Sequence, residues 1–364
     1  MSDLASAGLS ALELPDVELP NQEMRNAAFA RHLRLTKPTG ALGRLEPLSA
    51  WVSAVQGACP PLPFSQPTVV IFAGDHGIAR TAMTSAYPPE VTAQMVLNFV
   101  SGGAAVNVFA RQANATVRVV DVSVDADPHY VSDIAPFVIE HRIRRSSGSI
   151  DHEDALTIDE TRRAFNLGRT IADEEVDRGA DILIPGDMGI GNTTPAATLI
   201  GLLTNLDAAK VTGLGTGIDD ATWMRKCAAV RDAMRRGRPH IAEPLTLLAT
   251  VGGADFAAMT GFILQAAIRK TPVILDGTIS GACAVVADRI DYRAKHWWVA
   301  GHQSTEPAHR AALHHLDLEP ILDYELRLGE GTGAVLALPI LQAAIAILGE
   351  MATFDEAGVS DRDA

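Results

Sequence analysis

The sequence has little cysteine, little charge and few aromatic residues for its length. Three cysteines occur among 364 residues, and Cys59, Cys227 and Cys283 are widely spaced with no CxxC pair. This pattern offers no disulfide framework and no cysteine-based metal centre, and it fits a reducing compartment. Charged residues make up 20% of the chain against 47% hydrophobic residues. The composition therefore excludes a disordered protein and predicts a sizeable buried core.

Positively charged residues are scarcer than negatively charged ones. The 30 Lys and Arg residues face 44 Asp and Glu residues, which gives a formal net charge of −14. A nucleic-acid backbone or an anionic membrane would be repelled at long range, so we expect neither as a partner. Any phosphate ligand must then be held by local geometry.

The sequence also lacks the marks of export and of membrane insertion. No basic region followed by an apolar stretch opens it, so we expect no secretory signal and a cytoplasmic protein. One uncharged segment, 331–349, approaches the roughly 20 apolar residues of a membrane span. Its alanines, Pro339 and Gln342 favour a buried helix instead.

Short apolar runs bounded by glycine or aspartate occur along the middle of the chain, which is typical of buried parallel strands. Helix-like stretches at 90–112 and 158–178 lie between them. The expected fold is α/β, a parallel sheet flanked by helices in the Rossmann-like manner, with ligands at the carboxyl ends of the strands. The predicted strands are 68–73, 116–122, 180–185, 272–275 and 296–300.

The two ends of the chain differ from this middle part. Residues 1–20 hold four acidic residues and two prolines, and predict a flexible acidic lead-in. Residues 21–57 show helical spacing of apolar residues, interrupted by KPTGALG. Residues 57–67 contain four prolines and predict a linker at a domain boundary.

Glycines cluster in several motifs, and two of these motifs, GDMGIGNTT and DGTISGA, follow predicted strands. GDMGIGNTT (186–194) follows an apolar run and precedes a predicted helix, so its backbone can approach a ligand and its N–H groups can attract a phosphate. An ordinary strand–helix turn capped by Asn192, Thr193 or Thr194 is the alternative interpretation. Further clusters are GLGTG (213–217), VGGAD (251–255), DGTISGA (276–282) and GEGTG (329–333).

Several common nucleotide motifs are missing. GxxxxGK[ST] is absent and no convincing GxGxxG is followed by an acidic residue at the right spacing, which disfavours ATP hydrolysis and NAD binding. The paired acids and TGG signature of diphosphate-using phosphoribosyltransferases are also missing. This weakens the case for a magnesium-bound pyrophosphate donor.

Candidates for acid–base chemistry are Asp75, His76, Asp187 and Glu330. Asp75 and His76 could ligate a metal, but no second set with ligand spacing accompanies them, and such a pair more often braces a loop. Glu330 lies between two glycines before an apolar helix, where only the helix dipole calls for a carboxylate. It is therefore a candidate general base.

Taken together, the motifs resemble the nicotinate-nucleotide:dimethylbenzimidazole phosphoribosyltransferase family. They follow family order from residue 37 to residue 334, and nine in series are specific where each alone is weak. The motifs are KPTGALGRLE (37–46), AGDHGI (73–78), SAYPPEVTAQM (85–95), GDMGIGNTT (186–194), GTGID (215–219), VGGADFAAMTG (251–261), DGTISGA (276–282), GHQSTEPAHR (301–310) and RLGEGTGA (327–334).

The resemblance implies that nicotinate mononucleotide gives its ribosyl phosphate to dimethylbenzimidazole, with inversion at the anomeric carbon, yielding α-ribazole phosphate and nicotinate. It also implies a homodimer, whose chain has a large domain (62–315) and a small helical domain built from 21–61 plus 316–364. Glu330 stands where the family has its general base. We expect no cofactor and no metal.

The resemblance also implies a set of substrate-binding residues. Asp187 stands where many members are expected to have glutamate, which leaves its contact open. Lys226 resembles the family's binding-site lysine, and Ser85 and Gln94 fall in the segment associated with the base pocket. The residues expected to line the nucleotide site are Asp187, Gly189, Gly191, Asn192, Gly215, Gly217, Lys226, Gly252, Gly253 and Ser304.

The chemistry agrees with these residues. A pyridinium leaving group departs neutral, so no acid or metal is needed to expel it, while the acceptor imidazole must lose its N–H proton to a base. Burial would raise the pKa of Glu330 and a helix N-terminus would lower it. Two alternatives are a nucleotide glycohydrolase, which would need no apolar acceptor pocket at 83–95, and a non-catalytic nucleotide-binding protein, which would need no Glu330.

Overall fold

The structure is a computed structural model that describes residues 14–360. Its six strands are β1 (Pro67–Gly74), β2 (Thr116–Ser123), β3 (Ile182–Met188), β4 (Val273–Leu275), β5 (Trp298–His302) and β6 (Pro320–Leu322). The α-helices are α2 (Gln22–Arg34), α3 (Leu45–Gln56), α4 (Ile78–Thr81), α5 (Val91–Val100), α6 (Ala105–Gln112), α7 (His129–Ser132), α8 (Ile158–Asp177), α9 (Thr193–Thr204), α10 (Ala208–Val211), α11 (Asp220–Gly237), α12 (Pro244–Val251), α13 (Ala254–Ile268), α14 (Thr278–Ile290), α15 (Pro307–Leu316), α16 (Thr332–Glu350) and α17 (Phe354–Ala357). Short 3₁₀ turns are η1 (Pro136–Val138), η2 (Arg238–His240) and η3 (Ala294–Trp297).

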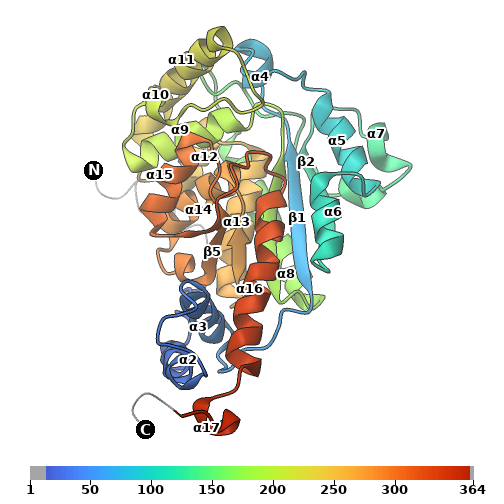
Figure 1. Cartoon of the computed structure of the whole chain (residues 1–364). Coiled ribbons are helices and arrows are strands. Elements are labelled where there is room, and N and C mark those ends of the chain that lie inside the picture. The colour runs from blue at the N-terminus through green and yellow to red at the C-terminus, as the bar shows by residue number, and fades with distance from the viewer. Residues whose placement is uncertain (1–13, 361–364) are drawn as a thin grey trace.

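The strands form one parallel sheet in the order β2-β1-β3-β4-β5-β6, with helices on both faces (Figure 1). This confirms the predicted α/β fold. After β2 the chain returns to the other side of β1, so the strand order reverses between β1 and β3. At such a reversal the connections that follow the two strands run to opposite faces of the sheet. They leave a crevice outside the carboxyl ends, in which ligands bind.

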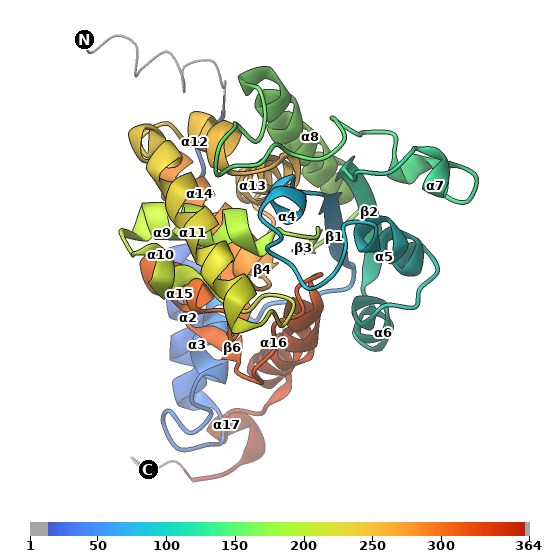
Figure 2. The same ribbon diagram turned by 90° about the horizontal axis from the view of Figure 1, so that it is seen from above.

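Alternate side chains of the central strands belong to two separate hydrophobic cores, one on each face of the sheet. Val70 and Phe72 of β1 pack with α8, α13 and α14, whereas Val69 and Ile71 pack with α5, α6 and α16. Figure 2 shows these helices on opposite sides of the sheet. Because successive side chains on a strand point to opposite faces, a strand buried on both faces is mostly apolar, as β1 is apart from Thr68.

Two departures from the predicted elements have simple causes. The stretch 90–112 is two helices, α5 and α6, because the chain turns at Gly102, which has a φ of 77°. The strand β6 was not predicted, since a run of three residues carries no periodic signal. The uncharged segment 331–349 is the helix α16, as predicted, and within residues 14–360 it is one of two stretches, with Val91–Gln112, that are long and apolar enough to cross a membrane by length and composition. Residues of α16 such as Leu338 and Leu341 are buried against the sheet.

The ends of the described chain pack together away from the crevice. Helices α2, α3 and α17 lie at one end of the molecule, where α16 reaches them (Figure 1). The boundary predicted at residue 316 precedes β6, so the sheet continues past it, and α16 contacts both the sheet and α3.

Residues 14–20, the described part of the predicted flexible lead-in, are held in place by contacts. Residues 1–13 lie outside the described residues, but Val17 is buried and its N–H donates to Asp291. The Trp297 indole donates to the carbonyl of Glu18 at 2.7 Å. Residues 14–20 are therefore packed against the α/β body, because one apolar side chain among the acidic residues reaches the core.

Candidate active site

The glycine clusters meet at the carboxyl ends of β1, β3 and β4. A Cβ atom on Gly189 would lie 1.9 Å from the carbonyl oxygen of Gly74, and one on Gly186 would lie 2.5 Å from that of Glu330. No side chain fits at either position. These glycines let the loop after β3 pass directly against the end of β1 and against the segment that carries Glu330.

The loop 186–194 ends at an uncapped helix. Gly191 has a φ of 95°, which favours glycine, and Asn192 is the N-cap residue of α9. The predicted side-chain cap is absent, because the Asn192 amide turns back and donates to Asp187 at 2.6 Å. The Asn192 and Thr194 N–H groups bond to the carbonyls of Gly189 and Gly191, and residue 195 is a proline. Among the described residues at this helix start, the Thr193 N–H is thus left to attract an anion.

Asp187 is part of a buried pair of carboxyl groups. Burial, and then the neighbouring Asp255, raise the pKa of Asp187 well above its usual range. One oxygen of each carboxyl group, Asp187 Oδ1 and Asp255 Oδ1, has no hydrogen-bond partner among the described residues. His76 Nε2 lies 2.9 Å from the other Asp255 oxygen. His76 therefore contacts the helix α13, whereas the sequence predicted that the Asp75–His76 pair braces a loop.

Glu330 adopts an unusual backbone conformation. Its φ is 66°, and the glycines on either side are also left-handed. Its side chain is 5% exposed, and no hydrogen bond or ion pair engages its carboxylate within residues 14–360. Burial, and then the charge of Asp276, raise the pKa of Glu330 to about 7. Of the two opposing effects anticipated from the sequence, burial is the stronger.

Asp276, at the end of β4, holds the Glu330 segment in place. Its carboxylate accepts from the backbone N–H groups of Gly331, Gly333 and Ala334 at 2.9–3.1 Å, which caps α16. Although burial opposes ionisation, the contacts with His302 and these amides lower the pKa of Asp276. An ionised, fixed carboxylate thus sets both the position and the charge environment of Glu330.

Lys226 enters the site from α11 and is 1% exposed. Its ammonium donates to Thr193 Oγ1 at 2.8 Å and to the Gly213 carbonyl at 3.1 Å. Burial lowers its pKa to about 8, against the opposing charge of Glu306. The Gly215 N–H also donates to Glu306, at 2.7 Å, so the loop 213–217 is held beside the start of α9.

The remaining predicted site residues lie around the same edge. Ser304 Oγ accepts from the Glu306 N–H at 3.3 Å, so it braces the turn before α15. Ser85 Oγ lies 3.3 Å from Thr216 Oγ1, which joins the segment after α4 to the loop 213–217. Gly217 belongs to that loop, and Gly252 and Gly253 join α12 to α13 beside His76. Gln94 is exposed on α5, and no hydrogen bond joins it to these residues within the described chain.

Sequence reasoning missed four residues that organise the site. Asp276 and Glu306 lie in two of the quoted motifs, and their position after β4 and β5 was the available signal. Arg327 donates to the Gly215 carbonyl at 2.5 Å. Thr92 bonds to two other elements, and although it lies in the quoted motif 85–95, the sequence does not show which residues of that motif make such contacts.

The fold and this edge define an enzyme that acts on a nucleotide phosphate. The crevice lies at the strand-order reversal, the helix start and Lys226 suit an anion, and Glu330 has the pKa of a proton acceptor at neutral pH.

Comparison with known proteins gives the particular family. The family described as Phosphoribosyltransferase matches residues 17–359. The nicotinate-nucleotide–dimethylbenzimidazole phosphoribosyltransferase of Mycolicibacterium paratuberculosis is 57% identical over 353 residues, which are 97% of this chain and 99% of that protein. The protein of that name from Mycobacterium leprae strain TN is 56% identical over 349 residues, 96% of this chain and 98% of that one.

A solved structure agrees with these relatives. The crystal structure of the phosphoribosyltransferase of the same name from Thermus thermophilus matches with a TM-score of 0.87 and 41% identity, over 94% of this chain and 99% of that one. The chain belongs to the nicotinate-nucleotide:dimethylbenzimidazole phosphoribosyltransferase family.

Proposed function

We propose that the protein transfers the ribosyl phosphate of nicotinate mononucleotide to 5,6-dimethylbenzimidazole, giving α-ribazole 5′-phosphate and nicotinate, in assembly of the cobalamin lower loop. The observation that carries this proposal is the buried, unpaired Glu330 carboxylate with a pKa of about 7. As one nitrogen of the acceptor attacks the anomeric carbon, the other nitrogen loses its proton to Glu330. The C–N bond to the pyridinium breaks, and its electron pair neutralises the departing nicotinate ring.

The nucleotide is bound at the start of α9 and along the glycine loops. The Thr193 N–H at the start of α9 and the backbone of the glycine loops hold the phosphate, and Lys226 supplies a buried cation near it. Asp187 acts through Asn192, whose amide it orients. Because the leaving group departs neutral, the chain needs no metal. The other residues assigned to this site are Gly189, Gly191, Gly215, Gly217, Gly252, Gly253 and Ser304.

The acceptor binds beside the segment 83–95, with Ser85 and Gln94 at its pocket. Met83 and Tyr87 are exposed large side chains in this segment, and Leu328 is another beside Glu330. Exposed apolar side chains next to a polar nucleotide site suit a flat aromatic base. A nucleotide glycohydrolase would have no use for them, which is why we favour transfer over hydrolysis.

We also propose a cytoplasmic homodimer whose subunit has a large α/β domain (62–315) and a small helical domain (21–61 plus 316–364). The three free cysteines support a reducing compartment. The packing of α16 on α3 supports the small domain. Light scattering after size-exclusion chromatography measures the subunit number, and a mass of one chain would contradict the dimer.

The test of the function is product analysis. The protein is mixed with nicotinate mononucleotide and dimethylbenzimidazole, with a chelator and without added metal, and the products are identified by mass spectrometry. We expect equal amounts of nicotinate and the ribosylated base. Ribose phosphate in place of the ribosylated base would indicate the glycohydrolase, and activity restored only by a divalent ion would contradict the metal-free mechanism.

A further inference from the structure

Thr92 bonds at once to two other elements of the active-site edge. It lies in the first turn of α5 and is 0% exposed. The N–H of Ile190, in the nucleotide loop, donates to Thr92 Oγ1 at 3.0 Å. Thr92 Oγ1 in turn lies 2.6 Å from Asp75 Oδ1, at the end of β1.

The directions of these bonds follow from their chemistry. A backbone N–H can only donate, so Thr92 Oγ1 must accept from Ile190 and turn its own proton to Asp75. The separation of 2.6 Å is that of a hydroxyl bonded to an ionised carboxylate. Burial raises the pKa of Asp75 to about 6, which leaves it ionised at neutral pH. The two bonds use the donor of the hydroxyl and one of its two lone pairs.

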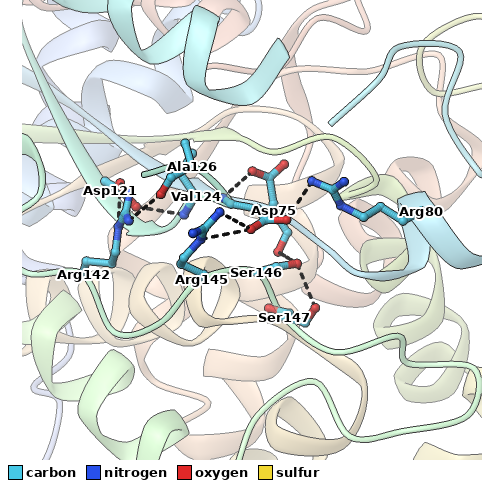
Figure 3. Close-up of polar contacts among 10 residues, drawn as sticks. Asp75, Arg80, Asp121, Val124, Ala126, Arg142, Arg145, Ser146 and Ser147 are labelled. Carbon is cyan, nitrogen blue, oxygen red and sulfur yellow. Dashed lines mark hydrogen bonds and ion pairs between the residues drawn. The ribbon is translucent and has the colours of Figure 1, made fainter. Parts of the chain in front are cut away.

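Asp75 is itself rigidly held, so it can serve as the fixed end of this link. Its other carboxylate oxygen accepts from the Asp125 N–H at 2.8 Å, and its carbonyl accepts from the Ser147 N–H at 2.8 Å. The Asp125 carboxylate is held by Arg80 at 2.7 Å and by Arg145 at 3.1 Å. Figure 3 shows Arg80, Arg145 and Ser147 around Asp75.

From this geometry we propose that Thr92 is a positioning residue that locks α5 to the nucleotide loop, and so fixes the acceptor relative to the anomeric carbon. The inference rests on the proposed function, in which the segment 83–95 binds the acceptor and the loop 186–194 binds the nucleotide. Transfer requires reacting atoms about 3–3.5 Å apart, and a misplacement of ~1 Å can cost ~100-fold in rate. Thr92 Oγ1 joins the segment 83–95 to the loop 186–194, and it joins both to Asp75, the residue that follows β1.

The test is Thr92→Val, which keeps the size of the side chain and removes both bonds. We expect kcat for transfer to fall about 10- to 100-fold, while the dissociation constant of each substrate, measured separately, changes less than about threefold. Thr92→Ser keeps the hydroxyl and should restore kcat. The matched control is Thr260→Val, because Thr260 is equally buried but bonds only within its own helix, to Phe256.

The outcomes separate the possible explanations. A folded Thr92→Val protein with wild-type kcat would overturn the inference, as would an equal loss in Thr260→Val. If Thr92→Val does not fold, Thr92→Ala also removes both bonds, and wild-type kcat in that variant would overturn the inference equally. Wild-type protein that makes no ribosylated base would contradict the proposed function itself, irrespective of Thr92.

Discussion

Glu330 combines three features that cost stability. A non-glycine residue in the left-handed region costs about 1–2 kcal/mol, the residue is 5% exposed, and its burial raises the pKa of the carboxyl group to about 7. Capping of α16 does not account for these costs, because Asp276 already caps that helix. A carboxylate kept in place at such cost is expected to serve the reaction.

Replacement of Glu330 by glutamine tests this role. Glu330→Gln keeps size and removes basicity, so substrate binding should persist while kcat falls ~100- to 10,000-fold, which is ~3–5 kcal/mol of transition-state stabilisation. Stopped-flow or single-turnover kinetics measure the chemical step. A folded variant that binds both substrates with near wild-type turnover would contradict the assignment, and Asp75 and Asp187 would be tested next.

Stability gives an independent readout of the same substitution. The folded-state pKa of Glu330 is raised to about 7, so the folded protein binds its proton more tightly than the unfolded chain. Wild-type stability should therefore fall as pH rises from the unfolded value through 7. Glu330→Gln should be more stable than wild type by about 1–3 kcal/mol at pH 8, with little difference at pH 5. A capping role would instead destabilise the variant by about 0.5–2 kcal/mol at both pH values.

The rate should depend on pH with two limbs. Glu330 must be ionised to accept a proton, so kcat should rise with pH through about 7. Lys226, with a pKa of about 8, must be protonated to attract the phosphate, so kcat/KM should fall above that pH. The titration of the substrates themselves is common to wild type and variants. A kcat profile of Glu330→Gln that retains the acid limb would show that another group causes it.

At the scale of elements, the sequence predicted what periodicity and strand ends encode. Five strands were predicted because each contains a short apolar run, and the approach of the two glycine motifs that follow β3 and β4 is expected from the parallel sheet. The contacts of Thr92 with Ile190 and Asp75 could not be predicted, because they join segments 98 and 17 residues apart that no local pattern relates. The pKa of Glu330 also depends on burial that only the folded chain produces.

The nucleotide loop depends on glycine at residue 191. Gly191 has a φ of 95°, and a Cβ atom there would lie 2.9 Å from that of Ala79 in α4. Gly191→Val should therefore distort the loop and weaken binding of nicotinate mononucleotide about 10- to 100-fold, since such strain costs about 1–3 kcal/mol. Isothermal titration calorimetry measures this loss.

Gly349→Ala is the matched control for this substitution. Gly349 lies in α16, and its Cβ would find Pro60 at 3.9 Å, an ordinary contact. This variant should bind the nucleotide normally and gain about 0.5–1 kcal/mol of stability. Unchanged nucleotide binding in Gly191→Val would place the phosphate elsewhere.

At the scale of the whole molecule, residues 14–20 attach the N-terminal part of the described chain to the α/β body. Two ion pairs, Asp16–Arg293 and Glu18–Lys270, accompany the burial of Val17. The acidic partners are 87% and 69% exposed, and exposed ion pairs contribute about 0–1 kcal/mol each. Burial of one valine contributes about 1.5–3 kcal/mol, so Val17 rather than the charges should hold the segment.

This comparison gives the last prediction. Val17→Ala should lower the free energy of unfolding by about 1–3 kcal/mol, because it removes two buried methyl groups from the core cluster. Asp16→Asn and Leu19→Ala, two residues of the same segment with exposed side chains, should each change it by less than about 0.5 kcal/mol. Denaturant titrations of the three variants measure these differences. A larger loss in Asp16→Asn than in Val17→Ala would mean that charge pairing holds the segment, and the packing argument for residues 14–20 would then be wrong.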